Sequence, residues 1–162
     1  MSVTDELVAN AETYAKGFDK GHLPMPPGRH VAIVACMDAR VNPYGIFGLT
    51  EGDAHVIRNA GGAVTDDVIR SLTISQRLLG TEEVILVHHA DCGMRTFNDG
   101  EFLRQIQEDT GIRPQWAPES FPDPADDIRQ SIARIQASPF LPNKGSVRGF
   151  IYDDKTGQLS EV

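Results

Sequence analysis

The sequence predicts an α/β fold, with a mostly parallel central β-sheet flanked by helices and preceded by an N-terminal helical arm. Short, nearly unbroken apolar runs recur along the chain, as is typical of strands covered on both faces of a parallel sheet. Helix-like segments separate these runs, and a β-α-β-α-β order implies parallel strands joined by right-handed crossovers. The 162 residues, 40% of them hydrophobic, suffice for one domain with its own core. We therefore expect a single domain over residues 1–162.

The first helix is expected from Thr4 to about Lys16. Thr4 is a suitable N-cap, and two acidic residues follow it in the first turn, where the helix dipole favours anions. A stiff Pro- and Gly-containing linker over residues 23–28 separates residues 1–22 from the body, so these residues form an arm. The arm either packs on a partner subunit or folds back on its own domain. Its apolar residues fall at helical spacing: Leu7, Val8, Ala11 and Tyr14.

The body is expected to alternate strands with helices. Thr65 is the predicted cap of the second body helix and Gly80 its end. In chain order the expected elements are a strand at 31–36, a short helix around 43–49, a strand at 54–58, a helix from about 66 to 79 and a strand at 83–88.

Beyond residue 92 the pattern weakens. A proline-rich stretch over residues 111–125 is expected to be an irregular loop, with Trp116 as a packing anchor. The remaining expected elements are a helix at about 97–108, an amphipathic helix at 126–136 and a hairpin of 147–152 with 158–160.

Composition and charge exclude some partners. The net charge is -8 and no basic run is present, which argues against binding to a nucleic acid backbone. No stretch approaches the roughly 20 apolar residues of a membrane span, and the N-terminus lacks the pattern of a signal peptide. We therefore expect a cytoplasmic protein without a nucleic acid or membrane partner. A structural disulfide is improbable in that compartment, so the two cysteines require another explanation.

Both cysteines lie where a strand should end. Cys36 closes one apolar run, and His89 and Cys92 follow another. Open α/β sheets place their sites at the carboxyl ends of strands, so neighbouring parallel strands would bring the three side chains together. Two thiolates and one imidazole are the ligands of an open zinc site, whose fourth position is left for water or substrate. Plain burial of the thiols is the alternative, whereas a closed zinc site or an iron–sulfur cluster would need more ligands.

A carboxylate and a guanidinium follow the first cysteine. Asp38 and Arg40 lie two and four residues beyond Cys36, so an extended backbone would place all three on one face. Asp38 would then orient a metal-bound water as a hydrogen-bond acceptor, and Arg40 would keep it ionised. Two alternatives remain open: Asp38 as a fourth metal ligand that closes the site, or an ordinary surface ion pair.

Three motifs together resemble the β-class carbonic anhydrase family, in particular its compact microbial branch. The resemblance covers about residues 28–97, and residues 148–152 fit it loosely. It implies a zinc ion, a catalytic dyad, and a homodimer or dimer of dimers in which the N-terminal helix embraces the partner. The motifs are Cys36-x-Asp38-x-Arg40, Arg58-Asn59-Ala60-Gly61 and His89-x-x-Cys92. The implied zinc ligands are Cys36, His89 and Cys92, and the implied dyad is Asp38 with Arg40.

The resemblance implies zinc-hydroxide-dependent reversible hydration of carbon dioxide to bicarbonate. Hydrolysis of carbonyl sulfide to carbon dioxide and hydrogen sulfide is the alternative on the same site, because relatives of the compact type include such hydrolases. A non-catalytic zinc-binding regulator or carrier is the alternative of another class. His88, Met94 and Gly61 are expected at the substrate pocket, and the first two of these are expected to shape its mouth.

Overall fold

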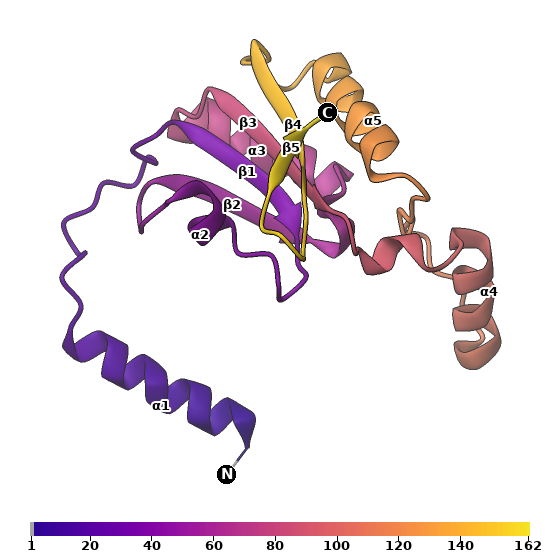
Figure 1. Ribbon diagram of the computed structural model, residues 1–162, viewed down its shortest axis with the longest axis horizontal. Helices are drawn as coiled ribbons and strands as arrows, with labels where there is room; N and C mark the ends of the chain where they lie inside the picture. Colours follow the sequence, from indigo (N-terminus) through magenta and orange to yellow (C-terminus); the bar gives the residue numbers. More distant parts are fainter. Residues whose placement is uncertain (1) are drawn as a thin grey trace.

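The computed structural model describes residues 2–162 and has the predicted α/β architecture (Figure 1). Five strands form one sheet in the order β2-β1-β3-β4-β5. The first four run parallel to their neighbours, and β5 pairs antiparallel with β4, so the mostly parallel sheet and the C-terminal hairpin are both confirmed. The strands are β1 (Val31–Cys36), β2 (Ala54–Asn59), β3 (Glu83–His89), β4 (Ser146–Tyr152) and β5 (Leu159–Glu161).

Each expected helix is present, with ends shifted by a few residues. They are α1 (Val3–Lys16), α2 (Pro43–Phe47), α3 (Asp66–Leu79), α4 (Asp99–Thr110) and α5 (Pro124–Ala137), with 3₁₀ turns η1 (Ala60–Gly62) and η2 (Gly93–Arg95). Thr65 caps α3 as predicted, and Gly80 ends it in a left-handed conformation. The predicted N-cap of α1 is wrong. Thr4 lies inside the helix, and Ser2 forms a reciprocal capping box with Asp5, an arrangement that satisfies two helix-end N–H groups.

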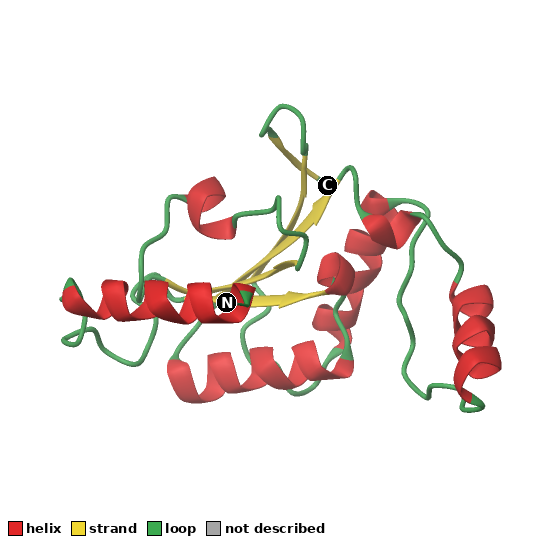
Figure 2. Cartoon of the chain, turned by 90° about the horizontal axis from the view of Figure 1, so that it is seen from below, coloured by secondary structure: helices red, strands yellow, loops and turns green. Residues whose placement is uncertain are grey.

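Helices cover the two faces of the sheet unequally. Figure 2 shows α3 and α5 on one side and the short α2 on the other. Along β1, Ala32 and Val34 belong to the larger core cluster, which also contains residues of α3 and α5. Ile33 and Ala35 belong to a second cluster with side chains near α2 and the C-terminal hairpin. The apolar run of β1 therefore follows from burial on both faces.

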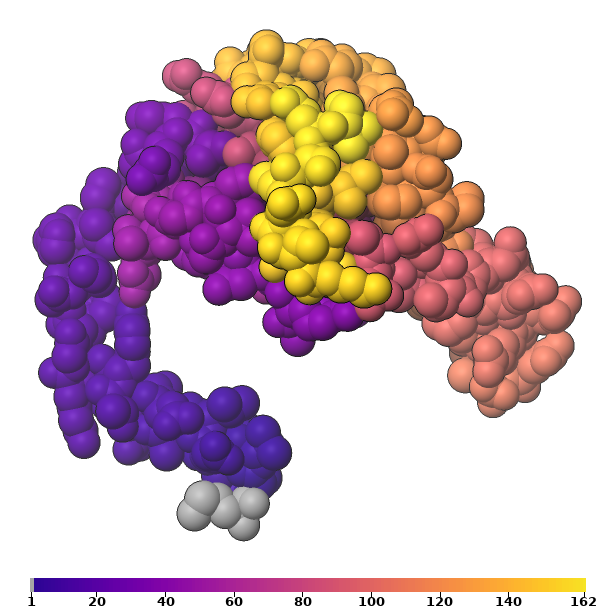
Figure 3. All heavy atoms as spheres, in the orientation of Figure 1, coloured from indigo at the N-terminus to yellow at the C-terminus, as the bar shows by residue number. Residues whose placement is uncertain are grey.

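The arm stands away from the body. All residues of α1 are exposed, and Figures 1 and 3 show α1 separated from the sheet by an extended linker. A hydrogen bond of 3.1 Å from the Tyr14 hydroxyl to the Glu51 carboxylate links the two parts. The possibility that α1 folds back to bury its apolar stripe on its own domain is therefore wrong.

Trp116 does not anchor the proline-rich loop. Its side chain is 58% exposed, whereas Phe121, a few residues later, is buried. The expectation for Trp116 is wrong because the loop runs beside α4, which projects from the body and buries none of its own residues (Figure 1).

None of the helices in residues 2–162 is long and apolar enough to cross a membrane.

Gly62 lets the chain cross closely over the ends of two strands. Its φ is +66°, and a Cβ there would lie 3.0 Å from the carbonyl carbon of Ala35 and the nitrogen of Cys36, and 3.1 Å from the Val87 oxygen. These neighbours are backbone atoms of β1 and β3, so they cannot move aside as a side chain would. The η1 turn is therefore held directly against the strand ends that carry the site.

Gly62→Ala should destabilise the fold more than an ordinary glycine replacement. A left-handed φ costs an alanine about 1–2 kcal/mol, and forcing an atom into packed structure adds about 1–3 kcal/mol. Gly111→Ala is the matched control, because Gly111 has a φ of +76° but nothing within 4 Å of its Cβ position. Urea unfolding should show at least twice the loss of unfolding free energy for Gly62→Ala. Equal losses would contradict the close approach.

Candidate metal centre

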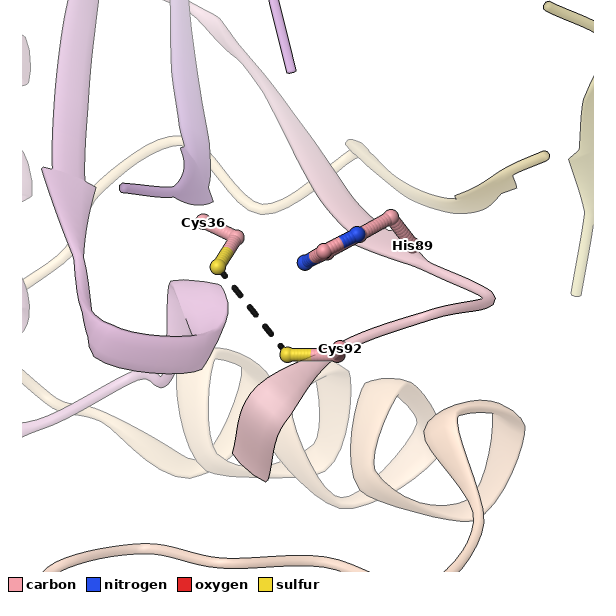
Figure 4. Close-up of side chains that lie close together, drawn as sticks. All are labelled: Cys36, His89 and Cys92. Carbon is pink, nitrogen blue, oxygen red and sulfur yellow. Dashed lines mark hydrogen bonds between the residues drawn. The ribbon is translucent and has the colours of Figure 1, made fainter. Parts of the chain in front are cut away.

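The ends of β1 and β3 bring together three side chains that can bind a metal. The two strands are parallel neighbours, and Cys36 and His89 are their last residues. Cys92 follows one turn after β3 and precedes η2. All three residues are buried, and one ligand atom from each lies within 4.8 Å of the others (Figure 4). The structure thus brings together the three residues predicted as ligands.

The donor atoms fit a metal with one open position. His89 Nε2 is buried without a hydrogen-bond partner among the described residues, although such groups are costly to leave unpaired. The two sulfur atoms lie 4.0 Å apart, far beyond the roughly 2.05 Å of a disulfide. Two sulfurs and one unpaired imidazole nitrogen form the donor set of a three-ligand zinc site.

The two thiols influence each other's protonation. A hydrogen bond with Cys92 holds the pKa of the Cys36 thiol well below its usual range, and hydrogen bonds from the backbone N–H groups of Asp38 and Gly61 add to this. The pKa of Cys92 is raised by the same contact with Cys36 and by burial. The contact therefore favours ionisation of the Cys36 thiol over that of Cys92. Because cysteine binds a metal as the thiolate, metal binding at these residues is linked to release of protons.

The protonation of His89 reflects opposing effects. Burial lowers its pKa, but the negative charges of Cys36 and Asp154 beside the ring outweigh burial, and the net shift is upward. Asp154 Oδ1 lies 2.9 Å from His89 Nδ1. This contact leaves the other ring nitrogen, Nε2, facing the two sulfur atoms.

Asp38 is held firmly by Arg40. The guanidinium donates to both carboxylate oxygens, with Nε 3.0 Å from Oδ1 and Nη2 2.8 Å from Oδ2. The backbone N–H of Arg40 donates to Oδ1 as well. These contacts hold the pKa of the Asp38 carboxyl well below its usual range. Asp38 Oδ2 lies 3.8 Å from His89 Nε2, so an ionised acceptor stands beside the three ligand atoms.

A turn, and not an extended strand, brings Asp38 back to the site. The expectation of a shared strand face is wrong, because β1 ends at Cys36 and the Val41 N–H donates to the Asp38 carbonyl in a tight turn. Arg58 stabilises this segment by donating to the carbonyls of Cys36, Asp38 and Val41. The motif that contains Arg58 predicts no role for it, because nothing in the local pattern shows where its guanidinium points.

A small cavity of about 140 Å³ opens at the two sulfurs. Its lining is mostly apolar, as suits a small uncharged molecule. Gly61 has a φ of +81°, and a Cβ there would lie 2.9 Å from Met94 Cγ and 3.2 Å from Phe121 Cε1. A side chain at position 61 would therefore take up space beside the cavity. The lining residues are Cys36, Met37, Asp38, Ala60, Gly61, Cys92, Gly93 and Met94.

Two of the three expected pocket residues line this cavity, and His88 does not. His88 is fully buried behind it, with Nε2 2.7 Å from an Asp127 carboxylate oxygen and its ring stacked on Phe121. Phe121 packs in one apolar cluster with Cys36, Cys92 and Met94. It was missed in the sequence because the proline-rich loop that carries it has no periodicity.

Comparison with known proteins gives a consistent result. A family model described as carbonic anhydrase matches residues 31–159. The chain is 62% identical to beta-carbonic anhydrase 1 of Mycobacterium tuberculosis over 162 residues, which cover 100% of this chain and 99% of that protein. It is 31% identical to carbon disulfide hydrolase of Saccharolobus solfataricus over 180 residues, covering 96% of this chain and 86% of the relative.

The solved structures agree with the sequence comparison. A crystal structure of carbonic anhydrase from Streptococcus mutans superimposes with a TM-score of 0.92 at 42% identity, covering 100% of this chain and 98% of that chain. Carbonic anhydrase from Glaciozyma antarctica has a TM-score of 0.89 at 42% identity, with 99% of each chain covered.

His89→Ala and Asp38→Ala should separate metal binding from the neighbouring acceptor. His89→Ala removes one of three donors and should weaken zinc binding by more than about 100-fold, the upper range for loss of an outer-shell partner. Asp38→Ala should leave zinc affinity nearly unchanged, because the carboxylate is bound by Arg40. Competition with a chromophoric chelator measures both. A large loss in Asp38→Ala would instead identify Asp38 as a fourth ligand.

Proposed function

Because the chain belongs to the β-class carbonic anhydrase family, we propose that it is a zinc lyase that reversibly hydrates carbon dioxide to bicarbonate. One observation carries the proposal: the donor atoms of Cys36, His89 and Cys92 lie within 4.8 Å of one another, and the two cysteines line a small, mostly apolar cavity. An uncharged substrate of three atoms suits such a cavity, and the ligand atoms lie where it would react.

We propose zinc as the metal, held by Cys36, His89 and Cys92. Zinc with three protein ligands lowers the pKa of a bound water and so supplies a nucleophile near neutral pH. Two cysteines exhaust the thiols of the chain, which disfavours a closed Cys-rich site or an iron–sulfur cluster.

Asp38 and Arg40 act as a pair. Asp38 stays ionised because the Arg40 guanidinium binds both of its oxygens. Its Oδ2 atom, beside the ligand atoms, accepts a hydrogen bond from the attacking water and so orients it. The apolar lining, including Met94, excludes competing water from the substrate side.

Hydrolysis of carbonyl sulfide is a second candidate. Carbonyl sulfide is linear and uncharged like carbon dioxide, and the same nucleophile would attack its carbon. The 31% identity to a carbon disulfide hydrolase, in an alignment that covers 96% of this chain, supports this candidate. The higher identity to a carbonic anhydrase places carbon dioxide first.

We propose that the chain works as a homodimer. Its arm presents a stripe of exposed apolar side chains, and a second copy is the occupant that the resemblance predicts. Stripes of this kind are usually covered by a partner. In the single chain, Leu7 is 60% exposed, Val8 57% and Tyr14 56%.

Paired initial rates on one zinc-loaded preparation test the proposed reaction. Stopped-flow measurement of carbon dioxide hydration should give a fast rate, and gas chromatography of carbonyl sulfide a slow one. The reverse ranking would make the chain a carbonyl sulfide hydrolase. Asp38→Ala should lose most turnover on the preferred substrate while it keeps its zinc. A zinc-loaded chain without turnover on either substrate would favour the non-catalytic regulator or carrier.

The oligomeric state tests the arm. Light scattering at micromolar concentration should give at least a dimer, and Leu7→Glu should shift the equilibrium toward monomer. Ala9→Glu is the matched control, since it adds the same charge two residues further along α1, where side chains do not share a face with position 7. A monomeric parent chain, or equal effects of both substitutions, would contradict the proposed interface.

A further inference from the structure

A buried carboxylate in the β4–β5 turn contacts the candidate metal centre from outside. The side chain of Asp154 is only 4% exposed. Its Oδ1 atom lies 2.9 Å from His89 Nδ1, and its Oδ2 atom accepts a hydrogen bond of 2.8 Å from the backbone N–H of Asp91. Neither the sequence motifs nor the resemblance pointed to this residue.

The first contact determines which nitrogen of His89 is free. An ionised carboxylate is only an acceptor, so the hydrogen on the imidazole must be on Nδ1. Nε2 then keeps its lone pair and faces Cys36 and Cys92, where it has no other partner among the described residues. A carboxylate behind a ligand histidine orients the ring and raises its basicity as a ligand.

The second contact holds the short turn that joins two candidate ligands. The backbone N–H of Asp91 lies between His89 and Cys92, and the N–H of Ala90 donates to the Tyr152 carbonyl at the end of β4. Asp91 in turn accepts a hydrogen bond from Arg40, which holds Asp38. The Asp154 carboxylate therefore contacts both the imidazole of His89 and the turn that leads to Cys92.

We propose that Asp154 is a positioning residue of the metal centre. It holds His89 in the tautomer and orientation that bind a metal through Nε2, and it sets the spacing between His89 and Cys92. The proposal rests on the zinc site of the proposed function. It makes metal affinity depend on the C-terminal hairpin, whose turn supplies the carboxylate.

The neighbouring aspartate has a different, purely local role. Asp153 accepts hydrogen bonds from the backbone N–H groups of Lys155 and Thr156, so it shapes the turn and has no contact with His89. Asp153→Ala is therefore the matched control for Asp154→Ala, because both remove a carboxylate from the same turn.

Zinc affinity, measured by chelator competition on the full chain, tests the proposal. Asp154→Ala should weaken binding by about 10–100-fold, the range for loss of a carboxylate behind a ligand histidine. Asp154→Asn should show a smaller loss than Asp154→Ala. Its single carbonyl oxygen can still accept a hydrogen bond from one of the two N–H groups, those of His89 Nδ1 and the Asp91 backbone. Asp153→Ala should bind zinc about as tightly as the parent chain, because Asp153 has no hydrogen bond to His89 or to the turn before Cys92. Absorption bands of the cobalt-substituted protein should change in Asp154→Ala and stay the same in Asp153→Ala.

Parent-like zinc affinity in Asp154→Ala would overturn the proposal. Equal losses in Asp153→Ala and Asp154→Ala would also overturn it, because they would show a general effect of the hairpin. Thermal melting of the metal-free variants checks that each is folded before its affinity is compared. Turnover does not enter this comparison, so a zinc-binding chain without hydration activity would overturn the proposed function alone.

Discussion

The parallel pairing of β1 with β3 is the constraint on which the rest of the site depends. Both strands are buried, and their side chains pack against helices on one face and the smaller cluster on the other. A one-residue slip in such a pair would turn every core side chain to the opposite face. The register that buries the core side chains therefore also places Cys36 and His89 side by side at the carboxyl ends of the two strands.

Around this pair, segments distant in the sequence supply the polar contacts. Arg58, at the end of β2, holds the carbonyls of the turn that carries Asp38. Asp154, from the C-terminal hairpin, holds His89 and the turn toward Cys92. These interactions are hydrogen bonds to charged groups, which are worth more than neutral ones and are directional. The site between β1 and β3 is thus preorganised by residues from β2 on one side and from the β4–β5 turn on the other.

Local signals predicted the elements well and long-range packing poorly. The apolar runs gave β1 and β3 within a residue, and Thr65 and Gly80 marked the ends of α3, because these features depend on neighbours in the chain. The prediction that Trp116 is a packing anchor was wrong, and the burial of Phe121 was not predicted. Both residues lie in a proline-rich loop without periodicity, where only the position of the loop on the body decides which ring is covered.

By itself, the sequence determined the fold class, the strand ends, and the residues able to bind a metal, because hydrophobic periodicity and residue chemistry are local properties. The tertiary structure alone decided which side chains meet those residues. It turned Asp38 back toward His89 by a tight turn, placed His88 behind the cavity against Asp127, and brought Asp154 to His89 across 65 residues of chain. Such contacts follow from how the strands and turns pack, and no spacing in the sequence encodes them.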